Sequence, residues 1–519
     1  MAGSGIAQSS TVATLDDAQA TSPVTFRSVD LGYPADSAGE TRGRSVNLLA
    51  VDTTQADALL RGRISPSWGT LAAPLRPAAP ATSIALPGSP SGLLLDLQSS
   101  LAAPLPGVLL VSLVVEDPLG TRTPVELPPV PVGATSVDVG ATLPATAPGL
   151  KLVGLVAQIL PESTDTDGLF DSPSTEAQVD VIVSNLRAVE RPAGADTDTV
   201  TPVPLTAVTW TVQGALQDNG NRPLLGIRTD GEALHVSGAV DLLEILFGRS
   251  AFAATTFPSP GALRVVVTDT LAAAFSAGPG DAFEIDLEGV RLPVVVDRVV
   301  AYLPGLPTGA AMLVDRDLLT RAALLGSSTD PLLDEWWLQV PDASAPALVE
   351  KVRVEDLGIA VDRVTAREVA TDGPLRVGVQ AALWIVTVAA VALAVAGFAM
   401  SATVSVRTRR LELARLQALG AARSGLVRSV LVEHGIVGVL GLVAGLVLGA
   451  VLGQVVAPLV TVSAEGSRPV PAVVVQWPWP TQAALVVALV VLVGGAVALT
   501  TSSLLRRASG ELLRLGDER

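Results

Sequence analysis

Cysteine is absent from the 519-residue chain, and lysine occurs only at Lys151 and Lys351. Without thiols the chain can form no disulfide, so an exported domain must be stabilised by its core alone. Neither lysine follows the glycine-rich pattern of a nucleotide-phosphate loop, G-x-x-x-x-G-K-[ST]. We therefore predict that the chain does not hydrolyse ATP by itself.

Candidate ligand clusters are scarce as well. His235 is the only histidine in the first 375 residues, and a single imidazole supports neither a zinc site nor a catalytic triad. The acidic stretch Ser163–Asp171 is similar to a calcium loop, but it has serine at its first ligand position and Ser174 at its twelfth. We interpret it as a surface turn, with a looser Ca²⁺ site as the alternative. In Gly88–Gly92, Pro90 occupies the place of a nucleophile. We predict no catalytic, cofactor-binding or metal-binding residue.

The charge of the chain is divided unequally along its length. The net charge is −16, yet residues 376–519 hold twelve arginines and six acidic residues, a net charge of +6, which leaves −22 for residues 1–375. An acidic region of this size repels a phosphate backbone, so we expect no nucleic-acid partner.

Three apolar stretches in the basic part exceed the roughly 20 residues of a membrane crossing. They are Val377–Val406, Gly435–Val460 and Thr481–Leu505, and none has a charged residue in its interior. Trp384 and the WPWP stretch at 477–480 suit the aromatic belts at a membrane surface. The sequence predicts three transmembrane helices and a multi-pass protein of the cell membrane.

A basic loop connects the first two predicted spans. Residues 407–428 contain six arginines and one acidic residue, Glu412, and the C-terminal tail has four more arginines. By the positive-inside rule, loop 407–430 and the tail are cytoplasmic, which leaves residues 1–375 extracytoplasmic. Gly420 stands where a helix would stop, and an apolar face follows it. That face consists of Leu426, Val427, Val430 and Leu431.

The order of these features resembles the FtsX/MacB-type ABC transporter permease family. The shared features are an arginine cluster, Glu412-Leu413, a short apolar helix, Leu419-Gly420-Ala421, a second basic helix, and Glu433 before a glycine-rich span. The resemblance covers about the last 145 residues. It extends more weakly to roughly residue 260, through Gly278–Asp281 and Val299–Gly305.

The resemblance implies that the loop is a coupling element held by a separate ABC ATPase subunit, which would bind the ATP. The chain itself would need no cofactor. The alternative is that the positive charges of the loop only fix the orientation of the chain in the membrane. The residues expected to contact the ATPase are Arg407, Arg409, Arg410, Glu412, Leu416, Gly420, Ala421, Arg423 and Glu433.

The second span carries an unbroken ridge of small residues, Gly441, Gly445, Gly449 and Gly453. Such ridges allow membrane helices to approach closely. We expect this ridge to pack against a neighbouring helix of the permease. The other expected partners of the chain are membrane lipids and either a second permease half or a homodimer partner.

The expected fold class is α+β, with a β-rich extracytoplasmic region followed by three transmembrane α-helices. We divide the chain into a partial extracytoplasmic segment (1–75), a β-sandwich-like domain (76–190), a MacB-like α+β domain (205–375) and an FtsX-like transmembrane domain (376–519). The composition of Arg191–Pro204 is that of a linker.

Local patterns support these assignments. Val108–Val115 and Val179–Val183 are typical of short strands between Pro/Gly turns. In Phe283–Leu287 apolar residues alternate with acidic ones, and a second strand pattern follows after a turn at Glu288-Gly289. This predicts a hairpin with one buried face. Trp336-Trp337 could line a ligand groove, although we expect both to be buried in the core.

The function implied is that of the membrane subunit of a bacterial ABC transporter complex, not itself an enzyme, in export or in handling of lipid or lipoprotein-type substrates. Spans without polar pathway residues suit such substrates better than ions. The alternative is an ATPase-driven regulator of an extracytoplasmic cell-wall hydrolase, and a third reading is an inactive fragment. Family members have a membrane helix before the external domain, so we expect the chain to be the C-terminal part of a longer permease.

Overall fold

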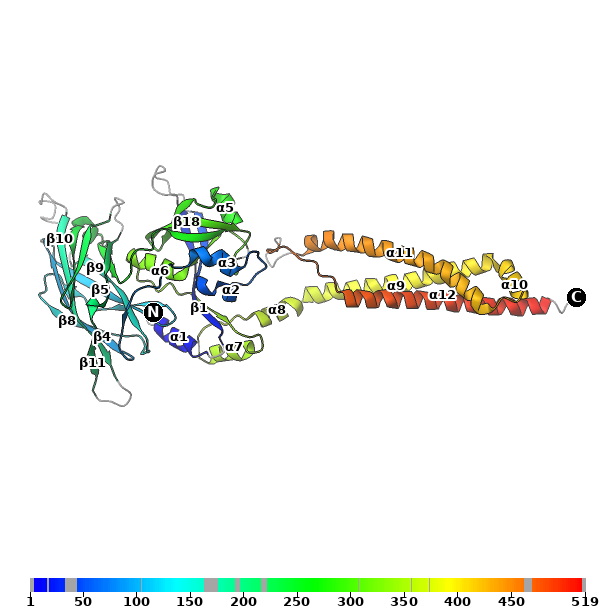
Figure 1. Cartoon of the computed structure of the whole chain (residues 1–519), viewed down its shortest axis with the longest axis horizontal. Coiled ribbons are helices and arrows are strands. Elements are labelled where there is room, and N and C mark those ends of the chain that lie inside the picture. Colours follow the sequence, from blue (N-terminus) through cyan, green and yellow to red (C-terminus); the bar gives the residue numbers. More distant parts are fainter. Residues whose placement is uncertain are drawn as a thin grey trace. The chain divides into compact units, whose positions relative to one another are not determined.

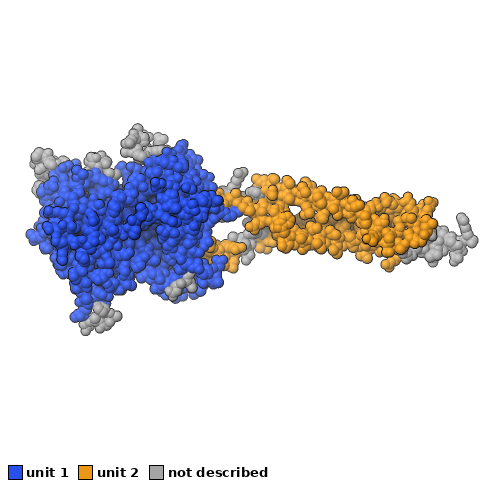
Figure 2. Space-filling view, viewed as in Figure 1, with its two compact units in different colours: residues 1–360 blue, residues 361–519 orange. Residues whose placement is uncertain are grey.

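The computed structural model describes residues 4–515 except 16–17, 33–43, 104, 163–175, 192–196, 216–221, 307, 356, 373 and 462–468. The chain divides into two compact units, residues 1–360 and 361–519 (Figure 2). The predicted fold class is confirmed, because a β-rich α+β region precedes three long apolar helices (Figure 1). The candidate calcium stretch, Ser163–Asp171, lies outside the described residues.

The first part of unit 1 is a mixed sheet built from both ends of the unit. Its strands are β1 (Ala20–Gly32), β2 (Arg44–Val51), β16 (Leu263–Thr268), β17 (Ala282–Leu287), β18 (Val290–Val300), β19 (Ala311–Asp315) and β20 (Glu335–Gln339). The order is β17-β18-β16-β19-β2-β1-β20, and β1 also pairs with β17. The first six strands therefore form a closed ring, with β20 added beside the start of β1.

The predicted hairpin in this sheet is confirmed. Strands β17 and β18 pair antiparallel from Ala282↔Val295 to Leu287↔Val290. Glu288 and Gly289 form the turn, both at positive φ (54° and 86°), as a two-residue turn that follows the strand twist requires. Every second side chain of β17, beginning with Phe283, is buried in the core of the ring. The alternation seen in the sequence thus fixes the register.

The second part of unit 1 is a sandwich of two antiparallel sheets. One sheet has the order β13-β14-β10-β4-β8 with β11 beside β10, and the other has β12-β15-β9-β5-β6 with β3 and β7 as short additions. Apolar residues from both sheets meet in one large core. The strands are β3 (Ile84–Ala85), β4 (Gly92–Leu101), β5 (Gly107–Glu116), β6 (Arg122–Glu126), β7 (Val130–Pro131), β8 (Val137–Thr142), β9 (Lys151–Pro161), β10 (Glu176–Glu190), β11 (Thr199–Pro202), β12 (Thr211–Gly214), β13 (Leu225–Asp230), β14 (Ala233–Asp241) and β15 (Ala251–Thr255).

The strand pairing sets boundaries that differ from the predicted ones. Strands β11 to β15 belong to the sandwich, and strands β1 and β2 belong to the mixed sheet rather than to a separate segment. Within the predicted linker Arg191–Pro204, β11 pairs with β10, so Thr199–Pro202 is an edge strand of the sandwich. Composition alone could not show this, because polar residues with proline are typical of edge strands as well as of linkers.

Short helices fill the connections of unit 1. They are α1 (Ser4–Ala13), η1 (Thr53–Gln55), α2 (Ala56–Leu59), α3 (Trp68–Ala72), η2 (Ala73–Leu75), η3 (Leu205–Ala207), α4 (Leu242–Leu246), α5 (Asp269–Phe275), α6 (Arg316–Leu325) and α7 (Ala345–Val354). Helix α6 begins at an Asp315 cap, whose carboxylate accepts from the Leu318 N–H at 3.1 Å.

The described residues of unit 2 form five helices, α8 (Arg363–Asp372), α9 (Pro374–Thr408), α10 (Arg410–Ala418), α11 (Arg423–Val460) and α12 (Trp479–Leu515). Three of them are long and apolar enough to cross a membrane, over Val377–Thr408, Ser424–Ala457 and Trp479–Leu504. Side chains from α9, α11 and α12 form a small core around Ala402, Val406, Val430 and Val497.

Helix α11 corrects one boundary of the membrane prediction. The amphipathic helix expected after Gly420 and the span expected from Gly435 are a single helix that begins at Arg423. No proline or other helix breaker separates the two stretches, so the backbone hydrogen-bond ladder continues. As a consequence Glu433 lies within this helix, and the predicted apolar face is directed inward, with Leu426 and Val430 buried.

A buried ionic network joins the sandwich to α6. Arg122 of β6 is 5% exposed and contacts Asp317 (Nη2 to Oδ1, 2.6 Å) and Glu116 (Nη2 to Oε2, 2.9 Å). The guanidinium of Arg122 also lies over the Phe257 ring, 5.3 Å from its centroid. Burial lowers the pKa of the neighbouring Arg316 to about 10. Because two charged partners of Arg122 are on different parts of unit 1, the network fixes the sandwich against α6.

We predict that Arg122→Met lowers the free energy of unfolding by about 3 kcal/mol, since removal of one member of a buried pair leaves its partners uncompensated. Urea unfolding of the purified protein, followed by tryptophan fluorescence, measures the change. Arg264→Met is the matched control. Arg264 also forms an ion pair, at 2.9 Å to Asp297, but is 61% exposed, so its loss should cost less than about 1 kcal/mol. Equal losses in both variants would contradict the role assigned to the network.

Candidate functional site

The basic loop is a compact connection between two membrane helices. Helix α9 ends at Thr408, α10 starts at Arg410, and the chain passes Gly420 to enter α11. The Arg409 N–H still donates to the Ser405 carbonyl at 3.2 Å, and the Leu413 N–H donates to the Arg409 carbonyl at 3.0 Å. Backbone hydrogen bonds therefore carry the geometry of α9 into α10 through the turn.

Gly420 ends α10 as the sequence predicts. Its φ is +96°, a conformation that disfavours any residue with a Cβ. The Ala421 N–H donates to the Leu416 carbonyl at 3.0 Å, which is the 6→1 bond of a Schellman helix end. This turn reverses the chain within a few residues. Gly420 and Ala421 are thus fixed in the loop by backbone hydrogen bonding.

Of the leucines of α10 and Leu419, which directly follows it, one side chain is directed inward and three are exposed. Leu413 packs against the core of unit 2. Leu411, Leu416 and Leu419 are 74%, 46% and 85% exposed. A helix that only bridges two spans gains nothing from three exposed leucines, because each costs free energy in water. We call these three residues the leucine patch.

Two of the predicted coupling residues are brought together. Arg409 Nη1 donates to Glu433 Oε2 at 3.0 Å, which ties the start of α10 to α11. Both side chains are about half exposed, so the pair contributes little to stability. Glu412 has no ion pair among the described side chains, although an intrahelical pair with Arg409 or Arg415 was possible by spacing.

The remaining predicted residues lie in the same loop. Arg407, Arg410 and Glu412 are exposed, as are Gly420 and Ala421. Arg423 is the first residue of α11, and its side chain lies outside the described set. The loop thus exposes apolar and charged side chains together on α10 and its flanks.

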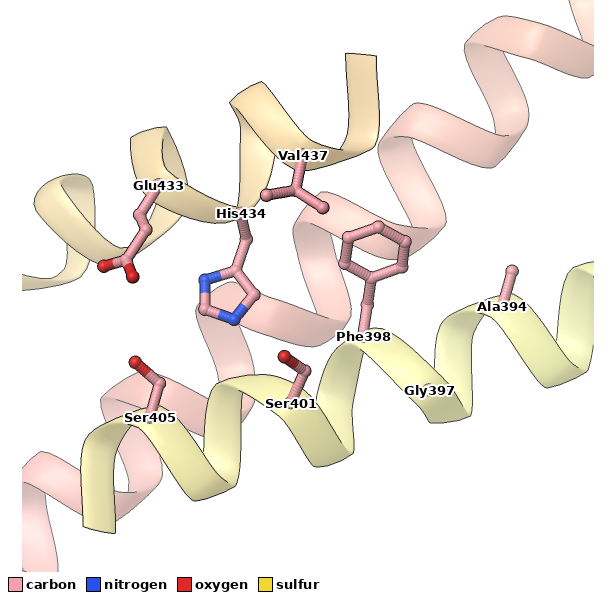
Figure 3. Close-up of a pocket in the computed structure, with 8 residues that line it drawn as sticks. All are labelled: Ala394, Gly397, Phe398, Ser401, Ser405, Glu433, His434 and Val437. Carbon is pink, nitrogen blue, oxygen red and sulfur yellow. The ribbon is translucent and has the colours of Figure 1, made fainter. Parts of the chain in front are cut away.

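A cleft of about 420 Å³ lies between α9 and α11, next to the loop (Figure 3). The side chain of His434 points toward the face of α9 that carries Ser401 and Ser405 (Figure 3). His434 Nδ1 is 3.0 Å from the Val430 carbonyl oxygen. Because a carbonyl only accepts, Nδ1 is the donor in this contact, which leaves Nε2 as the ring nitrogen that can bond to another group. The full lining is Ala394, Gly397, Phe398, Ser401, Ser405, Glu433, His434 and Val437.

Sequence reasoning missed this cleft because it placed the start of the second span at Gly435. Glu433 was predicted only as a coupling residue and His434 was not singled out, although both lie on a continuous helix facing α9. The signal that could have revealed them was the unbroken helical spacing of apolar residues from Leu426 onward.

The other candidate residues from the sequence give less support for a functional site. His235 lies on β14 opposite Ile182 of β10, in agreement with its strand-like context. Trp336 and Trp337 lie on β20 and are half-buried rather than fully buried, because β20 adds to the ring at its margin. Among the described residues, no group of three or more histidine or acidic side chains is placed to hold a metal ion.

Three of the described helices are long and apolar enough to cross a membrane, and a basic loop connects the first two. Residues 384–508 match the family model of the FtsX-like permease C-terminal domain. A search of curated proteins finds no match to the chain. The resemblance proposed from the sequence is confirmed over the membrane unit. Permeases of this family are membrane subunits of ABC transporters, are generally not enzymes, and generally work with an ABC ATPase.

Proposed function

We propose that the loop of residues 407–430 couples a separate ABC ATPase to the membrane helices, for export or for handling of lipid or lipoprotein-type substrates. ATP would be bound by that ATPase, and this chain would hold no cofactor. The leucine patch is the observation that carries the proposal, because it is an exposed apolar surface flanked by arginines and Glu412. A groove on the ATPase that buries these leucines would gain about 1.5 kcal/mol or more for each.

The packing of α10 supplies a route for movement. Leu413 of α10 contacts the same core as Val406 of α9, Val430 of α11 and Val497 of α12. The Arg409–Glu433 pair adds a second tie from the loop to α11. A displacement of α10 by the ATPase would therefore be transmitted to all three membrane helices, since close-packed side chains transmit strain. In this proposal Glu433 acts through Arg409 rather than by contact with the ATPase.

The orientation follows from charge. We infer that the loop and the C-terminal tail are cytoplasmic and that residues 1–375 are extracytoplasmic, because the arginines cluster at the loop and the tail. This places the leucine patch on the side of the membrane where ATP is available.

The glycine ridge supports a second permease half, or a second copy, as a partner. A Cβ placed on Gly441, Gly445 or Gly449 would have no atom within 4 Å, whereas one on Gly453 would lie 3.4 Å from Trp477. Three of the four ridge positions therefore face open space in this chain. Such a surface allows a helix of another subunit to approach closely.

Glu412→Lys should reduce the ATPase activity of the reconstituted complex by at least tenfold. A like-charge contact in a partly desolvated interface costs several kcal/mol, whereas loss of intrahelical pairing costs only a few tenths of a kcal/mol. Membrane insertion and abundance should stay normal. The measurement is ATP hydrolysis together with a pull-down of the ATPase. Glu355→Lys, an exposed charge reversal outside the loop, is the control. Wild-type binding and hydrolysis in Glu412→Lys would reduce the loop to a topological anchor.

Orientation is testable by thiol labelling in intact cells, because the chain has no cysteine of its own. Gly194, in the predicted linker, lies outside the described residues, so the exposed Ala343 is the better external position. An impermeant maleimide should label Ala343→Cys and should label Ser424→Cys only after the membrane is permeabilised. The reverse pattern would show that the orientation is wrong.

Gly445→Leu should leave membrane insertion intact, because a Cβ at this position meets no atom of the described residues within 4 Å. Association with the partner subunit should fall at least tenfold, since the leucine holds the two helices apart. Cross-linking and size-exclusion chromatography in mild detergent measure the assembly. Val447→Leu, at an exposed position on the same helix, serves as the control. Unchanged assembly of Gly445→Leu would mean that the ridge is not an interface.

A further inference from the structure

We propose that the cleft between α9 and α11 binds one phospholipid with a primary-ammonium headgroup, taken from the membrane leaflet at the basic end of the helices. The inference goes beyond the proposed function, and it depends only on membrane embedding, not on contact with an ATPase. It rests on the dimensions of the cleft, its polarity and its hydrogen-bonding groups.

The length of the cleft matches one leaflet. Ala394 and Ser405 mark its two ends on α9, and the eleven-residue separation corresponds to about 16 Å at ~1.5 Å per residue. This is about half of the roughly 30 Å hydrocarbon core. Ser405 lies two residues from Arg407, at the end of the apolar stretch. The cleft therefore runs from the membrane surface toward the middle of the bilayer.

The lining of the cleft changes from polar at the membrane surface to apolar toward the middle of the bilayer. At the surface end, the lining consists of Ser405, Ser401, Glu433 and His434. Toward the middle it consists of Phe398, Gly397, Ala394 and Val437. Polar groups at membrane depth are costly unless they have partners, whereas the apolar half is suited to acyl chain. A membrane lipid aligned with the helices satisfies both halves at once.

The hydrogen-bonding groups favour a headgroup that both donates and accepts. The acceptors are Nε2 of His434, since its Nδ1 donates to Val430, and the carboxylate of Glu433. The serine hydroxyls can donate to a phosphate. Glu433, which lines the cleft, forms an ion pair with Arg409 at the surface end, so a cation lies next to the anion of the site. A zwitterionic lipid whose ammonium group carries N–H donors is complementary to this arrangement.

The headgroup chemistry gives a sharp discrimination. Phosphatidylcholine has the same net charge as phosphatidylethanolamine, but its quaternary ammonium has no N–H to donate to His434 or Glu433. Phosphatidylglycerol has hydroxyl donors but no cation, and its net negative charge lies close to Glu433. If the acceptors of the cleft select the lipid, phosphatidylethanolamine binds most tightly of the three.

The test is native mass spectrometry of the full chain released from nanodiscs that contain the three lipids in equal amounts with identical acyl chains. We expect retained phosphatidylethanolamine to exceed each of the other lipids by about tenfold. Equal retention of all three would show only a general lipid annulus and would overturn the proposal. Phosphoethanolamine without acyl chains should not compete at the same concentration, and effective competition would show that the site is not a lipid site.

Variants locate the bound lipid. His434→Leu should abolish the preference for phosphatidylethanolamine over phosphatidylcholine, and His434→Gln, which restores an acceptor, should recover part of it. Gly397→Leu should reduce retention of every lipid by filling the apolar half, because open space surrounds Gly397. Gly378→Leu is the matched control, on the same helix and also in open space but outside the cleft.

Two results would overturn the assignment of the cleft. One is an unchanged lipid preference in His434→Leu together with unchanged retention in Gly397→Leu. The other is a wild-type protein that forms a lipid-free dimer, when the Gly397→Leu substitution makes that dimer dissociate. This result would mean that a second copy fills the cleft. If either variant fails to fold, the comparison of the three lipids on the wild-type protein still tests the proposal.

Discussion

The parallel pairing of β2 with β19 is the contact on which the architecture of unit 1 depends. It aligns Asn47–Val51 with Ala311–Asp315, and the whole sandwich is inserted between these strands. Asp315 reinforces the junction, because its buried carboxylate accepts from the Thr53 hydroxyl at 2.5 Å and also caps α6. The entropic cost of closing so long an insertion grows only logarithmically with its length, so one well-paired junction can hold it.

The same junction makes the two parts of unit 1 mechanically dependent on each other. Helix α6 leaves the mixed sheet at Asp315 and meets the sandwich through Arg122 and Asp317. The aromatic ring of Phe257 lies beneath two guanidinium groups, those of Arg122 and Arg321. A force on the mixed sheet would therefore reach the sandwich through a charged, buried contact rather than through a flexible linker.

A different constraint governs unit 2. In a bilayer each backbone polar group needs a partner within the protein, so the spans are uninterrupted helices. The chain can therefore turn only where the apolar stretch has ended, and Gly420 provides that turn beside the arginines. This constraint places Glu433 and His434 on a continuous helix. Their polar groups face α9 across the cleft, close to the basic loop.

Local sequence patterns were sufficient to predict those elements whose structure depends on interactions between nearby residues. Apolar length gave three membrane helices, the Phe283–Leu287 alternation gave a hairpin, and the position of Gly420 gave the end of α10. Each depends on neighbours within a few residues, through helix periodicity, pleat and turn geometry. The family resemblance was also readable in the order of residues in the loop.

Contacts between distant segments had to come from the tertiary structure. The assignment of β1 and β2 to the ring rests on the strand partners β17, β19 and β20, which are far away in sequence and which composition does not encode. The Arg409–Glu433 pair formed although Arg409 had Glu412 nearby on the same helix, because the turn at Gly420 returns α11 beside the end of α9. The sequence by itself thus determined the elements and their membrane character, while the packing of distant elements decided which strands share a sheet and which polar side chains meet.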